Sequence, residues 1–214
     1  LYERNSFQLR QQEYVAKAKI QVLKLEYKDK PPVFPNDRYD PTGRFRREQE
    51  FISKNKFRNS IIAKLSENFN NNSLIMVDRI DHGEELYGIL SSACKNKQVF
   101  FIRGDVAVDE RDRVRALMES SDNVICIAIS KIFSTGINIK NLHFIVFAGG
   151  GKAKVKIIQS IGRGLRLHKG KKGVIIIDIA DMLYYGNQHY MKRLKLYKTE
   201  KIKHGVKNLK EEKG

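Results

Sequence analysis

The hydrophobic positions of this chain form a regular pattern over most of its length. Five short, continuous apolar runs cover residues 74–77, 99–102, 124–129, 143–148 and 174–178. Charged stretches with helical composition separate these runs, at residues 84–94, at residues 109–120 and around residue 159. Continuous apolar strands that alternate with helices are typical of a parallel sheet covered on both faces. The pattern therefore predicts an α/β domain built on a parallel sheet.

The segments on either side of this pattern are less regular. Residues 1–17 have a polar, helix-like composition, residues 20–25 form a short apolar strand pattern, and residues 44–55 are again helical in composition. After residue 190 the chain is basic, and we expect a helix docked on the domain, followed by a frayed end. We therefore divide the chain into a lead-in segment that packs on the domain, the α/β domain itself, and a basic helix with its tail. These three parts cover residues 1–57, 58–185 and 186–214.

Charge and composition narrow the class of protein. The chain has 214 residues, with 41 Lys and Arg against 24 Asp and Glu, which gives a formal net charge of +17. Such an excess favours a polyanionic partner such as nucleic acid, although a merely basic protein is the alternative. The two cysteines and five histidines have no metal-ligand spacing. We expect no metal site, no membrane partner and a reducing, cytoplasmic compartment.

The loops that follow the predicted strands hold the polar residues. In a parallel sheet with right-handed crossovers these loops meet at the carboxyl edge, where ligands bind. Gly151 and Lys152 do not complete a P-loop, because Val146 and Ala153 stand where that motif needs a glycine and a hydroxyl. The domain therefore lacks its own site for a nucleotide's phosphates and Mg²⁺, and we expect a partner domain to supply one.

Residues 159–166 read QSIGRGLR and would place two guanidiniums and an amide on one face of a helix. Gln159, Arg163 and Arg166 fall at i, i+4 and i+7. A neighbouring apolar stripe can pack against the sheet and hold that face in position. Arginine offers a rigid, permanently charged fork of donors for phosphate oxygens. A solvated basic face is the alternative interpretation of the same residues.

The order and spacing of these segments resemble the second RecA-like lobe of superfamily 2 helicases. Residues 159–166 are similar to motif VI of that family, residues 133–139 to motif V and residues 74–86 to motif IV. The run FSTGINIKNLH at residues 133–143 resembles, more narrowly, phage DNA helicases of the UvsW type. The resemblance covers roughly residues 58–200. It implies a three-layer RecA-like sheet of the P-loop NTPase type, here without its own P-loop.

The resemblance also implies roles on the nucleotide side. Arg163 and Arg166 would be arginine fingers that reach the γ-phosphate of ATP, which an N-terminal RecA-like lobe of the same protein would hold with Mg²⁺. Gln159 would orient them or touch the phosphate or its water. The nucleotide side would also include Gly136, Asn138 and Gly162, although many relatives have Asp where Asn138 stands. For Gly136 the alternative is a tight turn only.

On the nucleic-acid side the resemblance implies contacts with the phosphate backbone. The residues at matching positions are Arg79, Arg103, Gly104, Ser130, Thr135 and Lys152. Arg79 and Arg103 could instead be ordinary surface charges. His82 either contacts DNA or simply begins a helix.

We therefore predict the C-terminal motor lobe of an ATP-dependent DNA helicase or translocase, located in the cytoplasm of the host if phage-encoded. Its partners would be single-stranded or branched DNA and the N-terminal lobe. The chain starts without an initiator Met, so we expect a fragment that does not hydrolyse ATP alone. The competing interpretations are a RecA-like nucleic-acid-binding module without motor activity and an RNA helicase lobe. Gln159, rather than His, argues against the DEAD-box group.

Overall fold

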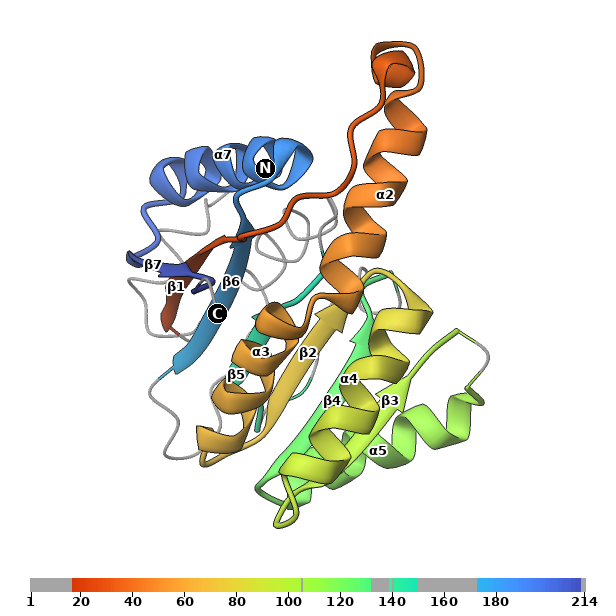
Figure 1. Ribbon diagram of the computed structural model, residues 1–214. Helices are drawn as coiled ribbons and strands as arrows, with labels where there is room; N and C mark the ends of the chain where they lie inside the picture. The colour runs from red at the N-terminus through yellow and green to blue at the C-terminus, as the bar shows by residue number, and fades with distance from the viewer. Residues whose placement is uncertain (1–16, 105, 132–138, 140, 150–172, 213–214) are drawn as a thin grey trace, which may run out of the picture.

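The computed structural model describes residues 17–104, 106–131, 139, 141–149 and 173–212 (Figure 1). Its sheet has seven strands in the order β3-β4-β2-β5-β6-β1-β7. Every neighbouring pair is parallel. The strands are β1 (Lys17–Glu26), β2 (Ser73–Val77), β3 (Gln98–Ile102), β4 (Val124–Ile129), β5 (Phe144–Phe147), β6 (Gly173–Asp181) and β7 (His204–Lys210). The predicted parallel sheet is confirmed.

The continuous apolar runs are explained by burial on both faces of the sheet. Along β2 the side chains alternate, so that Leu74 and Met76 enter one core cluster while Ile75 and Val77 enter the other. Strand β2 lies between β4 and β5 and is buried throughout. A strand that is covered on both sides has no polar face, and its sequence therefore shows no alternation.

Helices cover both faces and make three layers (Figure 1). They are α2 (Pro41–Lys54), α3 (Lys56–Asn68), α4 (Ile80–Ala93), α5 (Val108–Ser120) and α7 (Tyr184–Thr199), with a short 3₁₀ turn η1 (Pro35–Arg38). Helices α3 and α4 supply Ile62 and Leu86 to one core cluster, while α5 and α7 supply Met118 and Tyr197 to the other. Asp40 caps α2 by accepting from the Gly43 amide at 2.8 Å.

The tail differs from the sequence expectation. Residues 204–210 form strand β7, parallel to β1, with Ile20 opposite His204 and Glu26 opposite Lys210. The prediction of a frayed end was wrong here, because β1 presents an unpaired backbone edge that β7 satisfies. The boundaries at residues 57 and 185 stay predictions, but β1 and β7, from the two flanking segments, belong to the same sheet.

A buried ion pair fastens α7 to β6. The Nε of Arg193 donates to Oδ2 of Asp178 at 2.8 Å, and the hydroxyl of Tyr197 donates to the same oxygen at 2.7 Å. All three side chains are buried. The pair ties the basic C-terminal helix to β6, an inner strand of the sheet. Among the described residues, no helix combines the length and the apolar character that a membrane span requires.

Candidate functional site

The carboxyl ends of the parallel strands meet at one edge of the sheet, and this edge holds the described part of the candidate site. Arg79 follows β2, Arg103 and Gly104 follow β3, and Ser130 follows β4. Strands β3, β4 and β2 are neighbours in the sheet. The structure therefore brings together, on one edge, the four described residues that we predicted to contact nucleic acid.

Arg79 forms a two-pronged ion pair just before helix α4. Its Nε and Nη2 donate to the two carboxylate oxygens of Asp81 at 2.8 and 2.7 Å. The hydrogen bond from Arg79 lowers the pKa of the Asp81 carboxyl, which also accepts from the backbone N–H of His82. The Arg79 side chain is 35% exposed. The guanidinium is therefore held in a fixed orientation at the edge while part of it faces solvent.

Arg103 and Gly104 lie at the end of the edge strand β3. Nη1 of Arg103 lies 3.0 Å from Oε1 of Glu84, and both side chains are exposed. The backbone of this loop is braced by Arg111 of α5, which donates to the carbonyl oxygens of Gly104 and Val106 at 2.8 and 2.9 Å. Arg111 was not identified from the sequence, where it is one of several charges on a helix.

Ser130 is placed at the edge, but its side chain is already engaged. Its Oγ donates to the carbonyl oxygen of Val77 at 3.0 Å, and its backbone N–H donates to the same oxygen at 2.7 Å. The residue is buried. Ser130 thus fastens the end of β4 to the end of β2, and its hydroxyl would have to give up this bond to reach a phosphate.

His82 does not face solvent. It is 3% exposed in the first turn of α4, and its Nε2 lies 3.2 Å from Oδ1 of Asn59. Burial, together with the positive charge of Arg58, lowers the pKa of the imidazole to about 3. A neutral, enclosed ring cannot grip a phosphate. The sequence left open whether His82 contacts DNA or simply begins a helix, and the structure supports the second alternative.

A buried arginine lies beneath the edge and joins four segments. The Nε of Arg58 donates to Oδ1 of Asp181 at 2.8 Å, and its Nη2 donates to the carbonyl oxygen of Ala148 at 2.6 Å. The hydroxyl of Tyr27 donates to Oδ1 of Asp181 at 2.5 Å. Burial and the Asp181 charge raise the pKa of the Tyr27 hydroxyl well above its ordinary value. This cluster locks α3 and the segment after β1 onto the ends of β5 and β6.

The start of the glycine loop is fixed by close packing. The backbone N–H of Gly149 donates to the carbonyl oxygen of Met76 at 2.7 Å. A Cβ at this position would come within 2.5 Å of the Asp78 carboxylate. A larger residue here would therefore force the Asp78 side chain to move. The chain at Gly149 is thus tied to the end of β2.

Several predicted site residues lie outside the described part of the chain. They are Gln159, Gly162, Arg163 and Arg166 of the arginine segment, Thr135, Gly136 and Asn138 of the loop after β4, and Lys152 of the glycine loop. Their roles stay predictions. Within the described residues, no group of three or more His, Cys, Asp or Glu could hold a metal ion.

Comparison with known proteins gives a family match and related structures. Residues 54–168 match the model of the helicase conserved C-terminal domain. The ATP-dependent DNA helicase uvsW of Enterobacteria phage T4 is 28% identical over 184 residues, which cover 77% of this chain and 36% of that protein. The chain thus spans about a third of the length of this curated relative.

Solved structures agree with that match. The crystal structure of T4 UvsW superposes with a TM-score of 0.70 at 27% identity, over 90% of this chain and 42% of that chain. The C-terminal domain of the DEAD-box protein Dbp5 superposes with a TM-score of 0.54 at 19% identity, over 88% of this chain and 90% of that domain. At this lower identity Dbp5 shows only that the fold is shared.

Proposed function

Since the chain belongs to the helicase conserved C-terminal domain family, we propose that it is the C-terminal motor lobe of an ATP-dependent DNA helicase or translocase. The observation that carries the proposal is the family match over residues 54–168 on a parallel sheet of the same fold as T4 UvsW. The relative that is 28% identical is an ATP-dependent DNA helicase, which favours DNA over RNA as the partner.

In the proposed cycle, ATP and Mg²⁺ are held mainly by an N-terminal lobe and lie in the cleft between the two lobes. Closure brings Arg163 and Arg166 onto the γ-phosphate, where their charges stabilise the transition state. Gln159 orients them, while Gly136, Asn138 and Gly162 line the nucleotide side. The absence of a P-loop from this sequence supports a division of labour, because a second lobe must bind the phosphates.

The nucleic-acid strand would cross the carboxyl edge of the sheet. Arg79 and Arg103 are two of the described cations at this edge, and Thr135 and Lys152 would add further contacts. Both arginines are partly exposed and paired with carboxylates. Exposed ion pairs of this kind contribute little to stability. A phosphate can therefore replace Asp81 or Glu84 as the partner at small cost. Gly104 would approach the same strand through its backbone, whereas the backbone N–H and the hydroxyl of Ser130 already donate to Val77.

The buried cluster of Arg58, Asp181 and Tyr27 supports this cycle mechanically. An arginine finger acts only when it is held within a fraction of an ångström of its working position. The cluster fixes the end of β5 through Ala148 and the end of β6 through Asp181. The segment with Gln159, Arg163 and Arg166 lies in the sequence between these two strands. The cluster therefore fixes the point just after Ala148 where this segment leaves β5, whereas the segment joins β6 at Gly173, at the opposite end of that strand from Asp181.

The test is Arg166→Ala in the full-length protein. DNA-stimulated ATP hydrolysis should fall by about a thousandfold or more, while affinity for single-stranded DNA stays close to wild type. Arg113→Ala is the matched control, because Arg113 is 70% exposed on α5 and is not one of the predicted site residues. An Arg166→Ala variant with near-normal turnover would overturn the arginine-finger assignment. Comparing stimulation by single-stranded DNA, branched DNA and RNA separates the DNA motor from an RNA helicase lobe.

A further inference from the structure

An arm projects from the carboxyl edge of the sheet, and three of its arginines lie over exposed aromatic rings. The arm consists of α2, the turn η1 and the strap of residues 28–34, and α2 extends well beyond the layers of the domain (Figure 1). Three guanidiniums lie over three rings: Arg38 over Tyr39 at 4.5 Å, Arg47 over Phe34 at 4.7 Å, and Arg44 over Tyr184 at 3.7 Å. The rings are 74%, 51% and 52% exposed.

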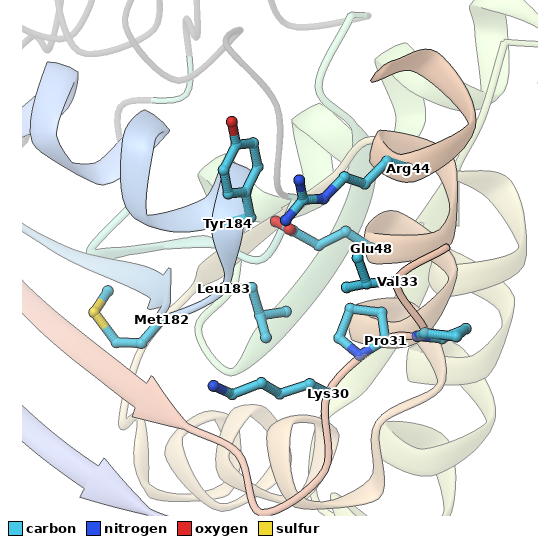
Figure 2. A pocket seen from close by; sticks show the side chains of 9 residues that line it. Lys30, Pro31, Val33, Arg44, Glu48, Met182, Leu183 and Tyr184 are labelled. Carbon is cyan, nitrogen blue, oxygen red and sulfur yellow. The ribbon is translucent and has the colours of Figure 1, made fainter. Parts of the chain in front are cut away.

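A pocket of about 300 Å³ lies at the foot of this arm, where the strap, α2 and the start of α7 meet. Arg44 and Tyr184 lie on one side of it and Lys30 on the opposite side (Figure 2). Pro31, Val33 and Leu183 contribute apolar wall. The pocket therefore combines a flat aromatic surface, an apolar wall and two cations. Its volume lies at the lower end of the range for ligand sites.

The one acidic side chain in the pocket lining, Glu48, already accepts hydrogen bonds from the protein backbone. Oε2 of Glu48 accepts from the backbone N–H of Tyr185 at 2.9 Å, and Oε1 accepts from that of Gly186 at 2.6 Å. Glu48 therefore caps the N-terminus of α7, where the partial positive charge of the helix offsets its own. Burial raises the pKa of Glu48, and the neighbouring charge of Arg44 partly offsets this effect. The lining thus holds two cations, Lys30 and Arg44, against this one carboxylate, so the pocket favours an anion.

The pocket belongs to the same edge of the sheet as the predicted strand contacts. Met182 and Leu183, which line it, directly follow Asp181 at the end of β6. Four inter-strand spacings separate β6 from β3, where Arg103 lies. At about 4.8 Å for each spacing, the separation is roughly 19 Å. One nucleic-acid strand could therefore reach from Arg103 to the pocket without leaving this edge.

We propose that this pocket binds one unpaired nucleotide of a nucleic-acid strand. The base stacks on the Arg44–Tyr184 pair and against the apolar wall, and the phosphate lies between Lys30 and Arg44. Bases stack well on aromatic rings and on guanidinium planes. A purely protein partner would have to desolvate both cations, whereas a phosphate replaces their water with charge-assisted hydrogen bonds. This inference rests on the proposed function in taking DNA as the natural strand.

The experiment measures binding of a single-stranded oligonucleotide that contains 2-aminopurine to the full-length protein. Tyr184→Leu should weaken binding by about tenfold and remove the fluorescence quenching that stacking causes. Tyr184→Phe keeps the ring and should behave like wild type. Tyr87→Leu is the matched control, because Tyr87 is an exposed tyrosine on α4, outside the pocket. Urea unfolding verifies that all variants are equally folded.

A second pair of variants tests the phosphate contact. Arg44→Gln should reduce the slope of log affinity against log salt by about 0.7, the value for one phosphate on a single strand. Arg113→Gln, which also removes one exposed arginine, should leave the slope unchanged. Wild-type affinity, quenching and salt slope in both Tyr184→Leu and Arg44→Gln would overturn the proposal.

These outcomes separate the pocket from the motor assignment. If Tyr184→Leu binds and hydrolyses normally while Arg166→Ala is inactive, the pocket proposal fails and the motor lobe stands. If the wild-type protein shows no DNA-stimulated hydrolysis but quenching still depends on Tyr184, the motor assignment fails and the pocket stands. A third outcome concerns free mononucleotide. If it abolishes the quenching, and if Tyr184→Leu leaves the affinity for the strand unchanged, the ligand is a free nucleotide and the strand proposal is overturned.

Discussion

At the scale of single residues, buried charge organises the carboxyl edge. Arg58 is fully buried and reaches both Asp181 and the carbonyl oxygen of Ala148. Removing one partner of such a pair leaves the other uncompensated and costs about 3–5 kcal/mol. The pair joins residues that are 123 positions apart in the sequence. The sequence placed Arg58 in an amphipathic helix but held no signal for its partner.

The exposed residues at the carboxyl edge, unlike the buried Arg58 pair, could be predicted from the sequence. Arg79, Arg103 and Gly104 were predicted at the edge from their positions after apolar strands, and the structure places them there. That part of the site is predictable because a parallel sheet puts every strand end on one edge. The commitment of the Ser130 hydroxyl to Val77 was not predictable, since it depends on which strands are neighbours. The burial of His82 likewise depends on the packing of α4 against α3.

His82 predicts a pH dependence of stability. Its pKa is about 3 in the folded protein and about 6.5 when unfolded. Between these values the unfolded chain binds an extra proton, so stability is complete above pH 6.5 and falls as pH decreases. From pH 7.5 to pH 5.5 the loss should be about 1.4 kcal/mol.

Urea unfolding of wild type and of His82→Gln at these two pH values measures that loss. Gln keeps a polar group near Asn59 but does not titrate, so the variant should lose about 1.4 kcal/mol less than wild type over the same interval. Equal losses in the two proteins would show that His82 is protonated, or exposed, in the folded state.

At the scale of elements, β7 shows where sequence patterns stop being informative. The strand HGVKNLK is largely exposed and has no apolar run. Its position is set by backbone hydrogen bonds: the N–H of Ile20 donates to Lys203, and the N–H of Glu211 donates to Glu26. The core strands were predictable because burial selects their side chains. A peripheral strand held mainly by its backbone leaves almost no trace in composition.

The register of β7 makes a paired prediction. In a parallel ladder with these two bonds, the N–H of Lys207 points towards β1, while that of Asn208 points away. Lys207→Pro removes a hydrogen bond and leaves a carbonyl of β1 unsatisfied, whereas Asn208→Pro removes none. Lys207→Pro should therefore be less stable than Asn208→Pro by about 1–3 kcal/mol in urea unfolding. The reverse order would mean that β7 pairs in a register shifted by one residue.

At the scale of the whole molecule, we propose that this lobe supplies one half of what ATP hydrolysis requires. In the proposed cycle, the carboxyl edge of the seven-stranded sheet, with its arginines, would face the nucleotide and the strand. The sequence has no P-loop, and the described residues include no cluster suited to a metal ion. The family match extends over this lobe, and the chain spans 36% of T4 UvsW. A motor of this kind converts hydrolysis into movement by changing the spacing of two lobes, which one lobe cannot do.

The 214-residue chain by itself should therefore not hydrolyse ATP, with or without DNA. Its turnover should stay at the level of a buffer blank in a phosphate-release assay, because charge stabilisation by Arg163 and Arg166 has no bound γ-phosphate to act on. A cooperative urea transition would verify that the chain is folded. The full-length protein, assayed with single-stranded DNA, is the positive control. Hydrolysis by the purified chain that disappears in Arg166→Ala would contradict the division of labour, because this lobe would then hold the phosphates itself.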